Sequence, residues 1–177
     1  KSKIFDDIIF ATDSNKYSEI AKYYGAEVPF LRDKESSGDK SPDLNWVEFM
    51  LNGLQNMGRK YDIFCILRPT SPFRLDTTIK KAFDLFLDNQ DFDSLRAVQK
   101  CKEHPGKMWI KNNNSLHPLM PFYNMNIPWH SSQYASLPEI YTQNASLEIS
   151  WTNSLKKNKS ISGDKILAYE SDSYEGF

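Results

Sequence analysis

Cationic and hydroxyl side chains are concentrated in one short stretch of this 177-residue chain, residues 66–74, which reads Ile-Leu-Arg-Pro-Thr-Ser-Pro-Phe-Arg. Guanidinium groups pair with carboxylates and phosphates through charge-assisted hydrogen bonds, and hydroxyls add neutral ones. The stretch therefore predicts binding of a polar, anionic ligand. The side chains that would do this are Arg68, Thr70, Ser71 and Arg74.

The elements around this stretch place it at the edge of a sheet. Residues 63–67 are an unbroken apolar run, typical of a strand buried on both faces. Two prolines three positions apart then end the strand, and residues 75–89 have helical periodicity. Open α/β sheets bind ligands at the carboxyl ends of their strands. A structural strand-to-helix turn, with Asp76 capping nearby, is the alternative, and the pattern alone leaves both open.

The rest of the chain alternates in the same way. Strand patterns occur at residues 8–11, 26–28, 63–67, 95–98 and 146–151, and helical patterns at 16–24, 43–57, 76–87 and 152–156. This alternation predicts a single α/β domain over residues 1–177, a three-layer α/β/α sandwich with a mostly parallel sheet.

Two segments break the alternation. Residues 31–41 are charged and small, and we interpret them as a mobile site loop, with a solvated connector as the alternative. Residues 106–144 begin with a hairpin pattern around an Asn-rich turn and continue rich in Pro, Asn and aromatic residues. They predict an irregular excursion from the sheet.

Composition excludes several classes. A net charge of −1 gives no basic field for nonspecific nucleic-acid binding. Two cysteines are too few for a disulfide framework, and the three histidines lack the spacing of a zinc site. No apolar run has membrane-spanning length, and no secretory signal opens the chain. We therefore expect a soluble, cytoplasmic protein with no nucleic-acid or membrane partner.

Five ordered motifs resemble those of the acylneuraminate cytidylyltransferases, also called CMP-sialic acid synthetases. They are Leu-Arg-Pro-Thr-Ser-Pro-Phe-Arg at 67–74, Ile-Ile-Phe-Ala-Thr-Asp-Ser at 8–14, Tyr-Gly-Ala-Glu-Val-Pro-Phe-Leu-Arg at 24–32, Asp-Ser-Leu-Arg-Ala-Val at 93–98 with His-Pro-Gly-Lys at 104–107, and Leu-Pro-Glu-Ile-Tyr-Thr-Gln-Asn-Ala-Ser at 137–146. The resemblance implies a Rossmann-like fold of the nucleotide-diphospho-sugar transferase type. It also implies a reaction that joins CTP to a nine-carbon 2-keto sugar acid, giving the CMP-sugar and pyrophosphate.

The family's nucleotide loop and its metal-binding Asp motif have no match in these residues. The resemblance therefore implies Mg²⁺ ligands beyond Phe177 and a nucleotide loop before Lys1. We identify no catalytic residue and no metal ligand within the chain, and we expect the 177 residues alone to be inactive. The family also implies a homodimer in which residues 106–144 form a protruding dimerisation arm.

Site residues carried over from the family fall into two groups. The resemblance implies nucleotide binding by Arg32, Ser41, Asp43 and Ser71, and sugar-acid binding by Arg68, Lys107, Asn144 and Glu148. The chain departs from the family at residues 39–43, which lowers the expectation of base contacts there.

The sugar side also departs from the family. Arg68 replaces a Gln, and its planar fork suits the carboxylate of the sugar acid. The alternative is that Arg68 pairs with an internal acid such as Glu148. Glu148 itself stands where an aromatic is typical, which points to modified acids of the legionaminic or pseudaminic type.

Two other functions stay open. One is another CMP-sugar synthetase of this fold, such as the eight-carbon 3-deoxy-octulosonate enzymes, although those resemble Gly-Asp-x-Pro where this chain has Pro-Thr-Ser-Pro. The other is a non-catalytic domain retained for binding or assembly. Sequence flanking the chain would discriminate between these readings.

Overall fold

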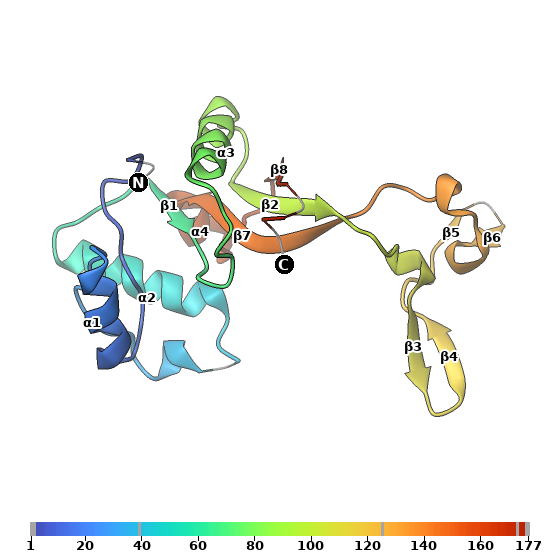
Figure 1. Ribbon diagram of the computed structural model, residues 1–177, viewed down its shortest axis with the longest axis horizontal. Helices are drawn as coiled ribbons and strands as arrows, with labels where there is room; N and C mark the ends of the chain where they lie inside the picture. Colours follow the sequence, from blue (N-terminus) through green and yellow to red (C-terminus); the bar gives the residue numbers. More distant parts are fainter. Residues whose placement is uncertain (1–2, 39, 125, 173, 176–177) are drawn as a thin grey trace.

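The computed structural model describes residues 3–38, 40–124, 126–172 and 174–175. Its main sheet has four strands in the order β1-β7-β2-β8 (Figure 1). They are β1 (Ile63–Ile66), β2 (Ser94–Lys100), β7 (Tyr141–Trp151) and β8 (Ile166–Glu170). β7 runs antiparallel to both β1 and β2, whereas β2 and β8 are parallel.

The sheet is thus mixed, and the expected mostly parallel pairing is not what these four strands show. The reason lies in the connection between β2 and β7. The chain leaves β2 at Lys100 and returns at Tyr141, directly opposite Lys100 in the register. A strand that re-enters the sheet at the end where its neighbour left must run the opposite way. β7 therefore separates β1 from β2, while β1, β2 and β8 share one direction.

Helices cover both faces of this sheet. α3 (Asp76–Asp88) packs on one face, where its Ala82 and Phe86 are fully buried against residues of β2 and β7. α2 (Asp43–Asn56) and α4 (Thr152–Asn158) cover the other face, where a second cluster joins Val47, Ile66 and Leu155. Because successive side chains of a strand point to opposite faces, the apolar residues of β7 on the α3 face alternate with residues that face α2 and α4.

The amino-terminal segment does not join the sheet. The strands expected at residues 8–11 and 26–28 form only a parallel bridge between Ile9 and Glu27. α1 (Asn15–Tyr23) lies between them in sequence, capped by the hydroxyl of Ser14. Ile8 is 55% exposed, so this segment lacks the burial that stabilises a central strand.

The loop at residues 31–41 is partly ordered by its own side chains. A short 3-10 turn (Glu35–Ser37) holds Ser36 in a buried position, where Asp33 Oδ1 accepts from its backbone amide at 2.8 Å. The hydroxyl of Ser41 donates to the carbonyl of Glu35 at 2.6 Å. Ser36 is therefore buried within a segment that was interpreted as a mobile loop or a solvated connector. Asp39 lies outside the described residues.

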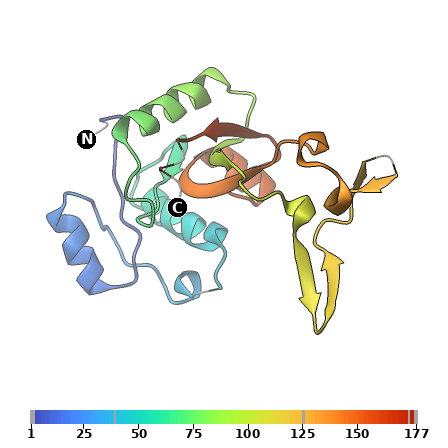
Figure 2. The same cartoon turned by 45° about the vertical axis from the view of Figure 1, so that its right-hand side comes forward.

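The residues between β2 and β7 form an excursion from the sheet, as expected, but with different bounds. It covers residues 101–140, because residues 141–144 of the expected arm are already part of β7. The excursion contains two short hairpins, β3 (Trp109–Asn112) with β4 (Ser115–Pro118), and β5 (Tyr123–Asn124) with β6 (Ile127–Pro128). Three short 3-10 turns complete it, at Pro105–Lys107, Trp129–Ser131 and Tyr134–Ser136. Figures 1 and 2 show this arm, residues 101–140, extending away from the four-stranded sheet. In the first hairpin, Asn113 has a φ of 52°, the left-handed conformation that a tight hairpin turn requires.

Among the described residues, no helix is long and apolar enough to cross a membrane.

Candidate functional site

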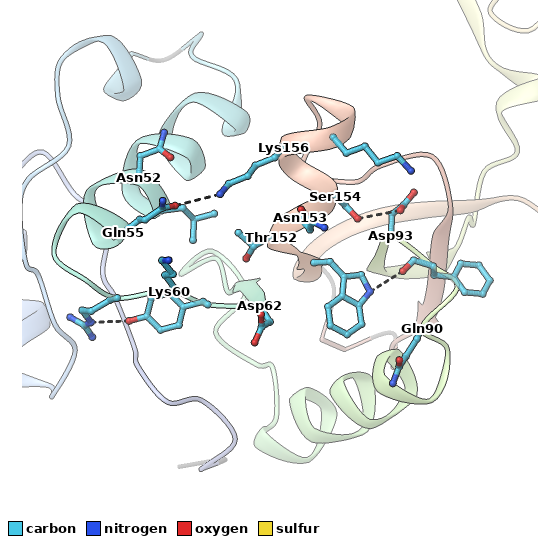
Figure 3. Close-up of a pocket in the computed structure, with 16 residues that line it drawn as sticks. Asn52, Gln55, Lys60, Asp62, Gln90, Asp93, Thr152, Asn153, Ser154 and Lys156 are labelled. Atoms are coloured by element: carbon cyan, nitrogen blue, oxygen red, sulfur yellow. Dashed lines mark hydrogen bonds between the residues drawn. The ribbon is translucent and has the colours of Figure 1, made fainter.

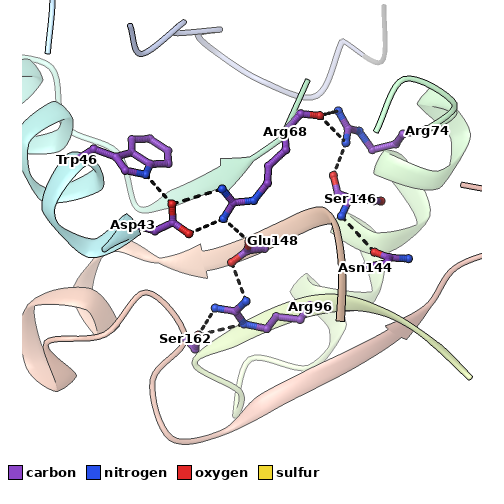
Figure 4. Close-up of polar contacts among 9 residues, drawn as sticks. All are labelled: Asp43, Trp46, Arg68, Arg74, Arg96, Asn144, Ser146, Glu148 and Ser162. Atoms are coloured by element: carbon purple, nitrogen blue, oxygen red, sulfur yellow. Dashed lines mark hydrogen bonds and ion pairs between the residues drawn. The ribbon is translucent and has the colours of Figure 1, made fainter. Parts of the chain in front are cut away.

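The stretch at residues 66–74 lies at the end of β1, and Arg68 is the second residue after that strand. The Arg68 guanidinium contacts Asp43 at two points, Nη2–Oδ2 at 2.5 Å and Nη1–Oδ1 at 3.3 Å. Its Nη2 also donates to Glu148 Oε1 at 2.9 Å. Asp43 is the first residue of α2 and Glu148 lies in the middle of β7, so one arginine joins three elements (Figure 4).

A second arginine completes this network from β2. Arg96 is the cross-strand partner of Glu148, and its Nη1 lies 2.9 Å from Glu148 Oε2 as an ion pair, although the two atoms are not aligned as a hydrogen bond. Arg96 Nε donates to the hydroxyl of Ser162 at 3.0 Å. The Glu148 side chain is only 6% exposed, and it lies between two guanidinium groups. We call Asp43, Arg68, Glu148 and Arg96 the charge row.

Arg74, the last residue of the singled-out stretch, is held by backbone carbonyls. Its guanidinium donates to the carbonyl of Arg68, at 3.4 Å from Nη2, and to that of Ser146 in β7. Burial lowers the pKa of Arg74. Ser71 closes the turn, because its amide donates to the Arg68 carbonyl at 3.3 Å. The loop therefore has a fixed shape that holds Arg68 against β7.

On the predicted nucleotide side, Trp46 links two of the predicted residues. Its indole Nε1 donates to Asp43 Oδ1 at 2.8 Å, and the Arg32 guanidinium carbon lies 6.0 Å from the centre of its ring. Arg32 Nη1 also donates to the carbonyl of Ser36 at 3.3 Å, which connects it to the loop that holds Ser41. The structure therefore brings together Arg32, Asp43, Arg68 and Glu148.

The pairing of Asp43 with Arg68 favours the charged form of both side chains. Burial alone would raise the pKa of Asp43, but hydrogen bonds from Arg68 and Trp46 more than offset this effect, so the pKa lies below its ordinary value. The same pairing raises the pKa of Arg68, with the hydrogen bond to Asp43 as the largest cause.

Two of the residues predicted to bind the sugar acid make hydrogen bonds outside the charge row. Asn144 is buried, its Oδ1 accepts from the amide of Ser146 at 3.1 Å, and its Nδ2 donates to the hydroxyl of Ser171 at 2.6 Å. These bonds shape an irregularity in β7 where the register with β2 shifts. Lys107 lies in the arm, where its ammonium donates to the carbonyls of His130, at 3.0 Å, and Ser132.

Sequence reasoning did not select Arg96 and Trp46. Arg96 had one usable signal, because a charged residue inside an otherwise mainly apolar strand demands a partner of opposite charge. Trp46 had none, since an aromatic in an amphipathic helix is most often part of the core.

One cavity lies away from these residues. It has a volume of about 780 Å³ and lies where β1 and β2 begin, between α2 and α4 (Figure 3). Its lining includes Lys60, Asp62, Asp93, Trp151 and Thr152 and none of the predicted site residues. Among the described residues, no group of three or more His, Cys, Asp or Glu side chains is placed to hold a metal ion.

Comparison with known proteins gives a family and a fold. Residues 1–172 match the family model described as Cytidylyltransferase. A pseudaminic acid cytidylyltransferase from Campylobacter jejuni is 36% identical over 116 residues, covering 66% of this chain and 50% of that protein. A CMP-N,N'-diacetyllegionaminic acid synthase from Legionella pneumophila is 29% identical over 164 residues, covering 91% of this chain and 66% of that protein.

A solved structure agrees on the fold. The structure of CMP:2-keto-3-deoxy-manno-octonic acid synthetase complexed with CTP superposes with a TM-score of 0.60 over 93% of this chain and 72% of that chain, at 9% identity. At that identity the likeness shows an α/β fold in common and nothing more. The chain spans half the length of the two Campylobacter jejuni relatives that it matches.

Proposed function

The chain belongs to the cytidylyltransferase family, and from that premise we propose that the full-length protein transfers CMP from CTP to a nine-carbon 2-keto sugar acid. In this reaction the anomeric hydroxyl oxygen bonds to the α-phosphorus, the bond to the β-phosphate breaks, and pyrophosphate leaves. The hydroxyl proton passes to a base or to solvent. The match of nearly the whole chain to the family model carries the proposal.

The nucleotide would lie beside α2 and the loop before it. Arg32, Ser41, Asp43 and Ser71 are the proposed contacts, and Arg32, Asp43 and Ser71 lie in or beside the network around Arg68. Asp43 stands at the start of a helix, where its carboxylate is available to hydroxyl donors as well as to Arg68. A ribose hydroxyl is a donor of that kind.

The sugar acid would lie beside Arg68, whose guanidinium suits a carboxylate. To bind it, Arg68 must exchange or share its contact with Asp43, the more exposed of its two acidic partners. Glu148 and Asn144 are proposed on the same side without touching the acid. Glu148 acts by orienting Arg68, and Asn144 acts through the shape of β7, since its amide is engaged. The names of the relatives favour acids of the pseudaminic or legionaminic type.

A homodimer is part of this proposal. The arm exposes large apolar side chains, including Leu116, Tyr123 and Tyr134, each more than half exposed. Interface cores are enriched in aromatic residues of this kind, so these exposed side chains support the arm as a dimer contact. Lys107, which lies in the arm, would meet a sugar acid only when such an assembly brings an arm to a site.

Magnesium is a further expectation from the family. Among the described residues, no group of three or more His, Cys, Asp or Glu side chains is placed to hold a metal ion without help from substrate phosphates or water. The prediction that its ligands lie beyond Phe177 stays a prediction. A cytoplasmic location also belongs to the proposal.

The proposal is tested with the purified full-length protein. Pyrophosphate release is measured with each of the four ribonucleoside triphosphates, with and without Mg²⁺. Each is paired with pseudaminic, legionaminic and N-acetylneuraminic acids and with an eight-carbon 3-deoxy-octulosonate. We expect release with CTP and a nine-carbon acid. Release with the eight-carbon acid alone would favour the other CMP-sugar synthetases, and no release with any pair would favour a binding or assembly role.

A further inference from the structure

Arg96 occupies an unusual position for a charged residue. It lies in β2 directly opposite Glu148, which in turn lies opposite Ile66 of β1. Ile66 belongs to the apolar cluster under α2 and α4. The three aligned residues on this face of the sheet are therefore one apolar residue, Ile66, and two charged ones, Glu148 and Arg96. The Arg96 side chain is 15% exposed. An arginine so placed needs a structural or functional partner.

The partners of Arg96 fix its orientation from two sides. Glu148 Oε2 lies 2.9 Å from Nη1, and the hydroxyl of Ser162, in the segment between α4 and β8, accepts from Nε at 3.0 Å. The guanidinium therefore faces Glu148 and not solvent. It does not contact Arg68, and the two arginines hold different oxygens of one carboxylate (Figure 4).

The charges of the row alternate and sum to zero: Asp43 negative, Arg68 positive, Glu148 negative and Arg96 positive. Without Arg96, Arg68 would face two carboxylates alone, and the row would carry one excess negative charge. That charge would lie next to the guanidinium that is proposed to bind an anion, in a region partly screened from water. An incoming carboxylate would then be repelled, and Arg68 would be held by its internal partners.

We propose that Arg96 is a positioning residue: by neutralising Glu148 it leaves Arg68 able to bind the carboxylate of the sugar acid. This inference rests on the proposed function and adds to it a residue that acts on affinity without touching the ligand. It also explains why an acid in β7 is compatible with an anionic substrate. Glu148 serves to orient two arginines and does not present a free negative charge.

The test uses four variants of the full-length protein: Arg96→Met, Arg96→Lys, Glu148→Gln and the double variant Arg96→Met with Glu148→Gln. Arg96→Met should raise the KM for the sugar acid by about 10- to 50-fold, the effect of one uncompensated charge within several ångströms near a protein surface. The KM for CTP should change by less than about threefold. Arg96→Lys keeps the positive charge, so its KM for the sugar acid should stay close to that of the wild type.

The double variant separates positioning from a merely structural role. Removing both charges leaves Arg68 paired with Asp43 and restores neutrality, so the KM for the sugar acid should return to within about fivefold of the wild type. Arg59→Met is the matched control, because it breaks ion pairs of 2.7 Å with Asp7 and Glu27 in another part of the fold. It should leave both KM values unchanged.

The inference is overturned if Arg96→Met leaves the KM for the sugar acid unchanged, if the double variant is as impaired as the single one, or if both KM values rise together. Calorimetric binding of the sugar acid distinguishes this failure from that of the proposed function. If the wild type binds the acid but releases no pyrophosphate, the proposed reaction is wrong. The variants are then compared by their Kd for the sugar acid in place of the KM. A wild type that binds none of the acids overturns both.

Discussion

Asp43 and Arg68 form a two-point ion pair between the start of α2 and the end of β1, with Nη2–Oδ2 at 2.5 Å and Nη1–Oδ1 at 3.3 Å. The pair joins a residue proposed for the nucleotide to one proposed for the sugar acid. Asp43 keeps a hydrogen bond from Trp46 when it releases Arg68, and its place in the first turn of α2 also stabilises its charge. The exchange that a ligand requires therefore leaves no isolated charge on Asp43.

Replacing Arg68 with Ala should reduce stability as well as sugar-acid use. The variant removes a shared partner of Asp43 and Glu148, and we expect it to lower the free energy of unfolding by about 1–3 kcal/mol. The KM for the sugar acid should rise by about 10- to 150-fold, with a small change for CTP. Denaturant unfolding and steady-state kinetics of the same preparations measure the two effects. Unchanged stability would show that the ion pairs of Arg68 with Asp43 and Glu148 contribute nothing to the free energy of unfolding. A loss of CTP affinity alone would assign Arg68 to the nucleotide-binding part of the site.

Acid should weaken the pair through Asp43. The pKa of Asp43 is lower in the folded chain than its ordinary value of 3.8, so its contribution to stability is complete above that value and is lost as the pH falls through the folded-state pKa. The difference in unfolding free energy between wild type and Asp43→Asn should be constant above about pH 5 and shrink toward more acid pH. Denaturant titrations at several pH values measure it. Asp84→Asn, which removes an exposed carboxylate of α3 outside the charge row, is the control. A difference that grows on acidification would contradict the sign of the shift.

Local patterns predicted the helices and the strand that position the site. The helix expected at 43–57 is α2 (Asp43–Asn56), the one expected at 76–87 is α3 (Asp76–Asp88), and the apolar run at 63–67 contains β1 (Ile63–Ile66). Each depends on periodicity and on helix or strand ends that neighbouring residues determine. The strand β8 (Ile166–Glu170) was not expected, although residues 166–169 form an apolar run as long as that of β1.

Pairing between distant strands could not be read in the same way. The direction of β7 depends on where the arm returns the chain, which lies some 40 residues beyond β2 and has no local signal. The partners of Arg68 show the same limit. The sequence analysis named Glu148 as a possible internal partner of Arg68, but it assigned Asp43, the other partner, to the nucleotide. Arg96 is a neighbour of Glu148 only because the cross-strand register places the two residues opposite each other.

Glycine at position 145 should stabilise the fold. Ala145 has a φ of 55°, the left-handed region that costs a residue with a Cβ about 1–2 kcal/mol. Ala145→Gly removes that strain and loses part of the gain to the greater freedom of the unfolded chain, so we expect a net increase of about 0.5–1 kcal/mol. Thermal and denaturant unfolding measure the change. Ala168→Gly in β8, an ordinary strand position, is the control and should lower stability by about 0.5–1 kcal/mol. A loss of stability in Ala145→Gly would mean that the methyl group packs in a way that outweighs the strain.

The arm should mediate a dimer, and charge placed on its exposed apolar residues should disrupt it. Tyr123 is 65% exposed and Ile127 is 55% exposed, on the two strands of the β5–β6 hairpin. Interface cores are rich in aromatic and depleted in charged side chains, so the double variant Tyr123→Glu with Ile127→Glu should be monomeric where the wild type is dimeric. Light scattering and sedimentation of the full-length protein at micromolar concentration give the mass. Tyr23→Glu, at an 84% exposed position at the end of α1, is the matched control and should leave the dimer intact. A wild type that is monomeric at these concentrations would remove the dimer from the proposal. A double variant that stays dimeric would place the interface outside the β5–β6 hairpin.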